Sequence, residues 1–365
     1  MSSRIRRSVA AVALFAPLAA LAFATPASAD EGHGEGRAGT IYTETNNADG
    51  NAVLALRNVD GNLTNVGSYA TGGRGSGDGL GSQGVLVADH NRLLAVNAGS
   101  NEVSLFSIGD NGRLTLRDVE SSGGIRPVSV TVHDNVAYVV NAGDRTVSGF
   151  RIGRHQIEPI PGSTRTLPGN GAAQISFDTD GDRLVITEKA TSTIDVLAVN
   201  DRGVAGVPVS NASTGETPFG FAIDRRDHVI VSNAAGGAAG ASSLSSYSFA
   251  GKTGLVSVSA AVADTQAAAC WVALSDNQKY AYTTNTGSGS ISSYRVGRDG
   301  SLTLINAVAA QPGAAPSDMV TTEGTLFALS GGSHTITSHD IAADGSLSAV
   351  SQISVPTGVA GLAAA

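Results

Sequence analysis

The sequence predicts an all-β fold, a seven-bladed β-propeller with four antiparallel strands in each blade. Seven short apolar runs recur at intervals of about 45 to 53 residues, and each ends at a comparable anchor residue. A second run with alternating apolar residues follows each of them, which is typical of β-strands. The last segment, 356–364, supplies the half-repeat that the first copy lacks. A repeat that is offset against its own ends predicts a ring closed by its termini.

Each anchor ends the second strand of a blade, and the seven anchors are Glu44, Asn97, Asn141, Glu188, Asn233, Asn285 and Ser330. Alternating segments such as 103–108 form the third strands, and pairs such as Asn111-Gly112 favour tight hairpins before the fourth. The predicted blades are roughly 40–71, 83–124, 126–168, 172–214, 217–264, 269–311 and 315–355. Residues 356–364 complete the first blade, and a β-sandwich would not explain seven similar units.

The first 29 residues have the pattern of an export signal, so we expect a secreted, extracellular protein. Arginines precede an apolar stretch at 9–23, and Ala27-Ser28-Ala29 fits a cleavage site. The apolar stretch is too short to favour a membrane anchor, and ordinary secretion is favoured over twin-arginine export. Residues 30–39 are polar and glycine-rich, which predicts a flexible lead-in. Residues 40–365 are expected to form a single domain.

Charge and cysteine content limit the partners. The net charge is −8, and removing the signal removes three arginines and no acid, which leaves −11. Such an acidic surface argues against nucleic acid and anionic membranes. Cys270 is the only cysteine, so no internal disulfide can form. We expect a monomer whose partner is a small molecule or another extracellular ligand.

Propeller topology places the residues that open the first strands and close the second strands on one rim of the channel. The first-strand residues on this rim are Gln83, Arg126, Gln174, Phe219, Cys270, Trp271 and Asp318. The turns between first and second strands, which hold His90, His133, Asp180-Gly181 and His228, fall on the opposite face. Loops at such a mouth carry function more often than other segments.

Glu188 is the candidate general base on this rim, because burial in a narrow channel raises the pKa of a carboxylate. Arg126 is the candidate residue for binding an oxyanion or a carboxylate of the ligand beside Glu188. Arg74 lies in a glycine-rich loop, residues 71–84, that can either fold over the channel mouth or form a mobile linker. The remaining candidates for ligand binding are Gln83, Asn141, Gln174, Asn233, Trp271 and Asn285. For the asparagines the alternative is an Asx-turn, in which the side chain bonds to nearby backbone.

No metal or cofactor is predicted. Oxygen ligands around the channel would suit Ca²⁺, but no loop motif supports a calcium site, and residues 178–182 lack EF-hand spacing. Residues 79–84 fit G-x-G-x-x-G but precede a strand, so the dinucleotide interpretation fails. Cys270 is expected to be a buried structural thiol, because a nucleophilic cysteine needs a base and no histidine is placed on the rim.

Several segments together resemble the seven-bladed lactonase family, which includes 6-phosphogluconolactonase-type and carboxymuconate-cyclase-type propellers. They are 121–130 (SSGGIRPVSV), 137–143 (AYVVNAG), 177–189 (FDTDGDRLVITEK), 217–224 (TPFGFAID) and 281–291 (AYTTNTGSGSI). The resemblance covers almost all of residues 40–364. The sequence is similar in particular to secreted actinobacterial proteins of this family. It implies opening or forming of a lactone ring at the channel mouth.

The resemblance also implies a glutamate at the end of a second strand and a Pro-Arg-His or Pro-His at the start of a first strand. Glu188 matches the glutamate. The histidine is missing, since blade 3 has Pro127-Val128 and blade 4 has Ala172-Ala173-Gln174.

Two functions remain open. One is a secreted lactone hydrolase, with Glu188 as base and Arg126 or Arg74 stabilising the oxyanion. The other is a non-catalytic propeller that binds a small ligand, glycan or protein through the same rim. A cycloisomerase fits poorly with export.

Overall fold

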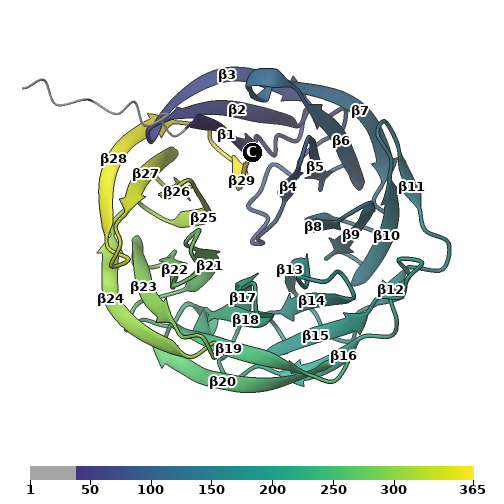
Figure 1. Ribbon diagram of the computed structural model, residues 1–365. Helices are drawn as coiled ribbons and strands as arrows, with labels where there is room; N and C mark the ends of the chain where they lie inside the picture. The colour runs from purple at the N-terminus through teal and green to yellow at the C-terminus, as the bar shows by residue number, and fades with distance from the viewer. Residues whose placement is uncertain (1–37) are drawn as a thin grey trace, which may run out of the picture. The chain divides into compact units, whose positions relative to one another are not determined.

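The computed structural model describes residues 38–365, which form a ring of seven antiparallel sheets around a central channel (Figure 1). The seven-bladed propeller predicted from the sequence is confirmed. The expected signal peptide and residues 30–37 of the lead-in lie outside the described residues. The first strand begins at Ala38 and so includes Ala38 and Gly39, which the sequence had assigned to the lead-in.

The strands of each blade run in chain order from the channel outward, except in blade 1. Blade 1 consists of β29 (Ala360–Ala364), β1 (Ala38–Glu44), β2 (Ala52–Val59) and β3 (Asn62–Ala70). Blade 2 consists of β4 (Leu86–Asp89), β5 (Arg92–Asn97), β6 (Glu102–Ile108) and β7 (Leu114–Ser121). Blade 3 consists of β8 (Pro127–His133), β9 (Val136–Asn141), β10 (Thr146–Ile152) and the short β11 (Ile157–Pro159) and β12 (Arg165–Thr166).

Blade 4 consists of β13 (Ala172–Phe177), β14 (Arg183–Glu188), β15 (Thr193–Ala198) and β16 (Val209–Ala212). Blade 5 consists of β17 (Pro218–Ile223), β18 (His228–Asn233), β19 (Ser243–Ala250) and β20 (Gly254–Ala263). Blade 6 consists of β21 (Ala269–Leu274), β22 (Tyr280–Asn285), β23 (Ser290–Val296) and β24 (Leu302–Ala310). Blade 7 consists of β25 (Pro316–Thr322), β26 (Thr325–Ser330), β27 (Thr335–Ile341) and β28 (Leu347–Ser354).

Two 3₁₀ turns, η1 (Asp110–Gly112) and η2 (Ala235–Gly237), lie between strands of blades 2 and 5. No helix in the described part of the chain is long and apolar enough to cross a membrane.

The ring is closed by pairing between the two ends of the chain. β29 is antiparallel to β1, with Ile41 opposite Ala364 and Tyr42 opposite Ala363. The backbone groups of Thr40 and Ala365 also bond to each other in both directions, at 2.8 and 3.0 Å. The predicted completion of blade 1 by the C-terminal segment is therefore confirmed.

The apolar core lies between blades, because each sheet buries both faces against its neighbours. Ile41 and Leu54 of blade 1, for example, pack with Phe327 and Ile336 of blade 7. Buried tyrosines also form hydrogen bonds from one blade to the next. The hydroxyl of Tyr42 donates to Gly112 O at 2.9 Å, and that of Tyr282 to Gly345 O at 3.0 Å. The Asn-Gly and Asp-Gly hairpins thus also present acceptors to the preceding blade.

Candidate functional site

The anchor asparagines bind neighbouring hydroxyl and carbonyl groups through their amide Nδ2 atoms. The Oδ1 atoms of Asn141 and Asn285 have no partner among the described residues, so these two side chains do not form the Asx-turns offered as the alternative. Asn285 Nδ2 donates to Ser290 Oγ and Ser292 Oγ at 3.2 and 2.8 Å, and Asn233 Nδ2 bonds in the same way to Ser243 and Ser245. Asn141 Nδ2 donates to Ser122 O and Thr146 Oγ1. All three side chains are buried, and these contacts fix each turn to the strand that follows it.

Glu188 occupies the equivalent position in blade 4 and is fully buried. Its Oε2 accepts from Thr191 and Thr193 at 3.3 and 3.4 Å, while Oε1 has no partner among the described residues. The backbone of Gly169 covers the carboxylate so closely that a Cβ there would lie 1.8 Å from Oε2. Burial, helped by the nearby charge of Asp195, raises the pKa of Glu188 to about 7. The carboxyl of Glu188 thus lies between the turn that follows β14 and the backbone of Gly169.

Arg126 and Arg74 are both exposed at the rim. Arg126 has a left-handed backbone (φ 56°), and its N–H donates to Asn101 Oδ1 at 2.7 Å. The backbone of Arg74 bonds to Gly99 and Ser100. No hydrogen bond or ion pair within residues 38–365 joins Arg126 or Arg74 to Glu188. The predicted base and oxyanion pair is therefore not assembled by direct contact.

The glycine-rich loop, residues 71–84, is held by backbone hydrogen bonds to neighbouring segments and reaches into the centre of the ring (Figure 1). The N–H groups of Gly75 and Gly77 donate to Asn47 O and Asn46 O at 2.8 and 2.9 Å. A Cβ at position 75 would lie 2.0 Å from the carbonyl carbon of Asn46, so glycine is required for this approach. Of the two interpretations of this loop, folding over the channel mouth fits these contacts.

Gln83, at the end of this loop, crosses the channel from blade 2 to blade 6. Its Nε2 donates to Val272 O at 2.9 Å, and its Oε1 accepts from Val272 N at 3.0 Å. Gln174 pairs in the same way with the backbone of Phe221, linking blade 4 to blade 5. Both glutamines extend a sheet edge with their amides, so both are framework residues in this structure.

Below Gln83 the first strands enclose a channel cavity of about 280 Å³. The carboxylate of Asp318 in its wall accepts from Met319 N and Leu362 N at 2.7 and 3.0 Å. Burial raises the pKa of Asp318 to about 8. This carboxyl ties blade 7 to the closing strand.

An aromatic and cationic group lies against the tip of the loop. Trp271 Nε1 donates to Ser82 O at 3.0 Å, and its ring centroid is 4.9 Å from that of Phe219. Lys189 Nζ lies 4.7 Å from the centroid of Phe219 and donates to Gly81 O at 2.6 Å. Burial lowers the pKa of Lys189, and the charge of Arg126 adds to this effect. Burial also raises the pKa of Cys270 to about 11, which fits an inert thiol.

A pocket of about 390 Å³ opens beside this group, at the mouth of the channel. We call it the mouth pocket; it is lined by Gly79, Leu80, Gly81, Ser82, Trp271, Ser317, Gly331, His334, Thr357, Gly358, Val359, Ala360 and Gly361. The backbone N–H groups of residues 79–82 have no partner among the described residues. The mouth pocket therefore combines an aromatic wall, free amide donors and one imidazole.

His334 is the residue that sequence reasoning missed. The sequence predicted no histidine on the rim, whereas His334 lies in the turn between β26 and β27. That turn follows the anchor Ser330, so counting four residues past the anchor places His334 on the rim. Its side chain is exposed and has no hydrogen bond within residues 38–365.

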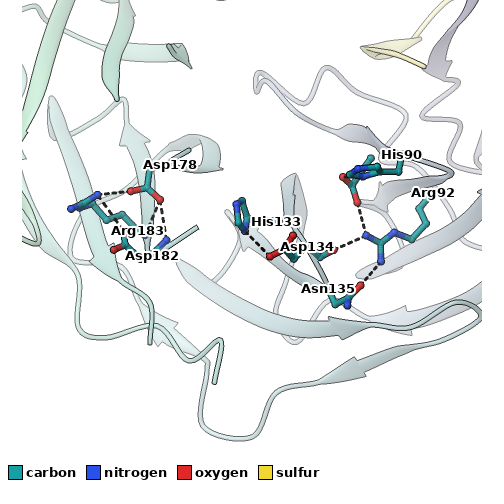
Figure 2. Close-up of polar contacts among 9 residues, drawn as sticks. His90, Arg92, His133, Asp134, Asn135, Asp178, Asp182 and Arg183 are labelled. Carbon is teal, nitrogen blue, oxygen red and sulfur yellow. Dashed lines mark hydrogen bonds and ion pairs between the residues drawn. The ribbon is translucent and has the colours of Figure 1, made fainter. Parts of the chain in front are cut away.

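The opposite face holds the turns between first and second strands, as the topology predicts. Figure 2 shows Arg92 between the turns of blades 2 and 3, where it donates to Asn135 Oδ1 and Asp134 O. In blade 4, Arg183 pairs with Asp178 at 2.6 Å and Asp182 at 3.2 Å. No group of three or more metal-ligating side chains occurs among residues 38–365, and residues 178–182 form an ion-paired hairpin.

Comparison with known structures shows the same fold. The chain is similar to a protein from Bacteroides fragilis provisionally assigned as a 6-phosphogluconolactonase, at 17% identity and a TM-score of 0.71, over 90% of this chain and 98% of that one. It is similar to a periplasmic gluconolactonase of Pseudomonas aeruginosa at 13% identity and a TM-score of 0.70, over 90% and 99% of the two chains. No curated protein matches the sequence.

A model of one sequence family matches most of the ring, over residues 83–238 and 234–362. Its description, "Lactonase, 7-bladed beta-propeller", agrees with the blade count and with the closed ring. The chain therefore belongs to the seven-bladed β-propeller lactonase family.

Proposed function

We propose that the protein binds a small lactone in the mouth pocket and hydrolyses it, with His334 as the general base. The observation that carries this proposal is the mouth pocket itself, which brings Trp271, His334 and the free amides of residues 79–82 around one space of about 390 Å³. A space of this size suits a sugar-derived or similar small cyclic ester. The periplasmic gluconolactonase of the same fold supports this substrate class.

Hydrolysis of a lactone requires a general base and hydrogen-bond donors that stabilise the oxyanion. His334 takes a proton from water as the water oxygen attacks the lactone carbonyl carbon. The carbonyl oxygen gains negative charge, which backbone N–H groups of the loop stabilise. The ring C–O bond then breaks, the ring oxygen takes up a proton, and the open hydroxy acid leaves. His334 thus supplies the imidazole that the family resemblance implies at first-strand positions and that blades 3 and 4 lack.

A panel of γ- and δ-lactones of sugar acids, assayed with His334→Gln, tests the proposal. We expect kcat/KM to fall roughly 10²–10⁴-fold, the usual worth of general acid–base catalysis. His133→Gln, on the opposite face, is the matched control and should retain wild-type turnover. Loss of turnover in Glu188→Gln with His334→Gln fully active would contradict the assignment of the base and favour the buried carboxyl.

Binding without turnover is the outcome that supports a non-catalytic propeller instead. Trp271 is the only tryptophan, so its fluorescence reports occupancy of the mouth pocket directly. Quenching by a lactone that is never hydrolysed would rule out the enzyme while keeping the site. Absence of both quenching and turnover across the panel would remove the mouth pocket as the functional site.

We also propose that this activity is extracellular and that the working unit is a monomer. The export-type pattern of residues 1–29 supports the first point. Immunodetection of the protein in culture medium tests secretion, and sedimentation equilibrium tests the monomer.

A further inference from the structure

A basic groove lies on the face opposite the mouth pocket, between blades 2 and 3. Its volume is about 850 Å³, and it is lined by His90, Asn91, Arg92, Ser107, Ile108, Gly109, Arg117, Asn135, Arg151, Ile152, Gly153, Arg154, His155, Gln156 and Glu158. Four arginines and one carboxylate therefore line this groove in a chain with a net charge of −8. Such a local reversal of sign on an acidic protein concentrates anions at one place.

Arg92 forms a neutral wall of this groove (Figure 2). Its guanidinium pairs with Asp89 Oδ2 at 2.5 Å and donates to Asn135 Oδ1 at 3.0 Å. It also donates to Asp134 O at 2.5 Å and to Ile152 O at 3.4 Å, so both Nη1 and Nη2 are engaged. The turns of the two blades are thereby held against each other, which fixes the shape of the groove.

Among residues 38–365, the other three arginines have no carboxylate partner. Arg117 Nε donates to Ser107 Oγ at 2.8 Å, and Arg151 Nη2 donates to Arg202 O at 2.6 Å. Each is therefore positioned by an uncharged acceptor and retains further N–H donors. Arg154 makes no hydrogen bond or ion pair within residues 38–365. Glu158, the one acid of the lining, accepts from Gln156 Nε2 at 2.6 Å.

Blade 6 carries a similar turn with different neighbours, which shows what is particular to the turn of blade 3. Arg295-Val296-Gly297-Arg298 repeats the pattern of Arg151-Ile152-Gly153-Arg154 at the end of the third strand. In blade 6 the next residue is Asp299, and the cation of Arg295 lies 5.7 Å from the Tyr280 ring centroid. In blade 3 the next residue is His155, and Arg117 of the neighbouring blade adds a further cation.

We infer that this groove binds a small polyanion that carries two or more phosphate or sulfate groups. Guanidinium groups match such tetrahedral oxyanions through paired N–H donors, and Arg117, Arg151 and Arg154 each offer donors that no carboxylate occupies. Several cations that line one groove favour a ligand with more than one anionic group over a monoanion. The groove is independent of the mouth pocket, since the two lie on opposite faces of the ring.

Calorimetric titration with inorganic tripolyphosphate, inorganic phosphate and a sulfated disaccharide tests the inference. We expect one tripolyphosphate site per chain, at least tenfold weaker binding of monophosphate, and weaker binding in 0.5 M than in 0.05 M NaCl. The sulfated disaccharide distinguishes phosphate-specific from sulfate-tolerant recognition, and binding of either polyanion at this site supports the proposal.

The double substitution Arg117→Gln, Arg154→Gln should weaken tripolyphosphate binding at least about tenfold. Arg298→Gln is the matched control, because it removes the same charge from the equivalent turn of blade 6, and it should bind within twofold of wild type. Both side chains in the double variant are exposed, and unchanged thermal melting would verify its fold. Absence of tripolyphosphate binding, or an equal loss in Arg298→Gln, would overturn the inference, as would preferential binding of a 20-base-pair DNA duplex.

Discussion

In blades 4, 5 and 6 the side chain that ends the second strand bonds to hydroxyl groups of the residues that follow it. At Asn233 and Asn285 an amide donates to serine hydroxyls, whereas at Glu188 the threonine hydroxyls donate to a carboxylate. The hydrogen bonds therefore run in opposite directions at equivalent places. Because Glu188 Oε1 has no partner among the described residues, its ionised form is poorly compensated. This position costs stability whenever the carboxyl carries its charge.

The pH dependence of folding should reveal this cost. The pKa of Glu188 is raised to about 7 in the folded protein from 4.5, so the folded state binds the proton more tightly. The contribution of Glu188 to the free energy of unfolding is therefore greatest below pH 4.5 and is lost as the pH rises through 7. We expect wild type to lose roughly 2 kcal/mol from this group between pH 5 and 8, after allowance for solvent screening. In thermal melts, Glu188→Gln should lose correspondingly less. The exposed control Glu216→Gln should follow wild type, and equal losses in all three proteins would contradict the assignment.

The sequence predicted the rim correctly in topology but not the direction of its side chains. Anchor spacing placed Asn141, Asn233, Asn285 and Glu188 at one end of their strands, which is where they lie. Whether a side chain turns toward the channel or into its own blade depends on the preceding connection, as Gly169 shows by covering Glu188. Such contacts join residues about 20 positions apart and leave no local pattern. The site assignments of Glu188 and Arg126 remain predictions.

The glycine-rich loop acts as an element in its own right, because its shape depends on close backbone approach. Gly75→Ala would place a Cβ 2.0 Å from the carbonyl carbon of Asn46, whereas a Cβ at position 79 meets nothing within 4 Å. We expect Gly75→Ala to lower the free energy of unfolding by roughly 1–3 kcal/mol, the usual cost of overpacking. Gly79→Ala should stay within about 0.5 kcal/mol of wild type. Urea denaturation measures both, and equal stability of the two variants would contradict the fixed loop.

The closing strand β29 is the element on which the ring depends. A chain that ends at Ser354 leaves the edge of β1 unpaired and removes Leu362 from the cluster between blades 1 and 7. We expect aggregation or loss of the folded state on expression, because an open apolar edge invites intermolecular pairing. Leu362→Ala keeps the pairing and should lose only about 2–3 kcal/mol. A truncated chain that melts like the intact protein would contradict closure by β29.

At this scale the sequence succeeded nearly everywhere, since strand alternation and turn residues are local signals. The exception is the outer strand of blade 3, which was expected to be continuous and is divided into β11 and β12. Pro159 and Pro161 explain the division, because proline cannot donate to a neighbouring strand. Gln156 and Glu158, at the start of this divided strand, line the basic groove.

In the whole molecule, cohesion comes from contacts between blades, since each cluster draws residues from neighbouring sheets. Near the channel, Gln83, Gln174 and Asp318 tie first strands of different blades through backbone groups. Unfolding of one blade would strip both of its neighbours of their packing. The ring should therefore unfold as one unit.

This cooperativity can be measured with the single tryptophan. Trp271 lies at the channel mouth in blade 6, while the far-ultraviolet circular dichroism signal averages over all seven blades. We expect the urea midpoints of Trp271 fluorescence and circular dichroism to coincide, as a two-state transition requires. Separate midpoints would show that the mouth melts before the ring and would contradict a single folding unit.

The contacts of Gln83 bear on how small molecules enter and leave the mouth pocket. Its amide spans the channel to Val272, and both residues line the channel cavity, so this bridge narrows the passage from the mouth into the channel. If the mouth pocket hydrolyses a lactone as proposed, the hydroxy acid product would leave by the path along which the next lactone arrives. Departing and arriving molecules therefore exclude each other, so the open acid should act as a competitive inhibitor that raises the apparent KM and leaves kcat unchanged.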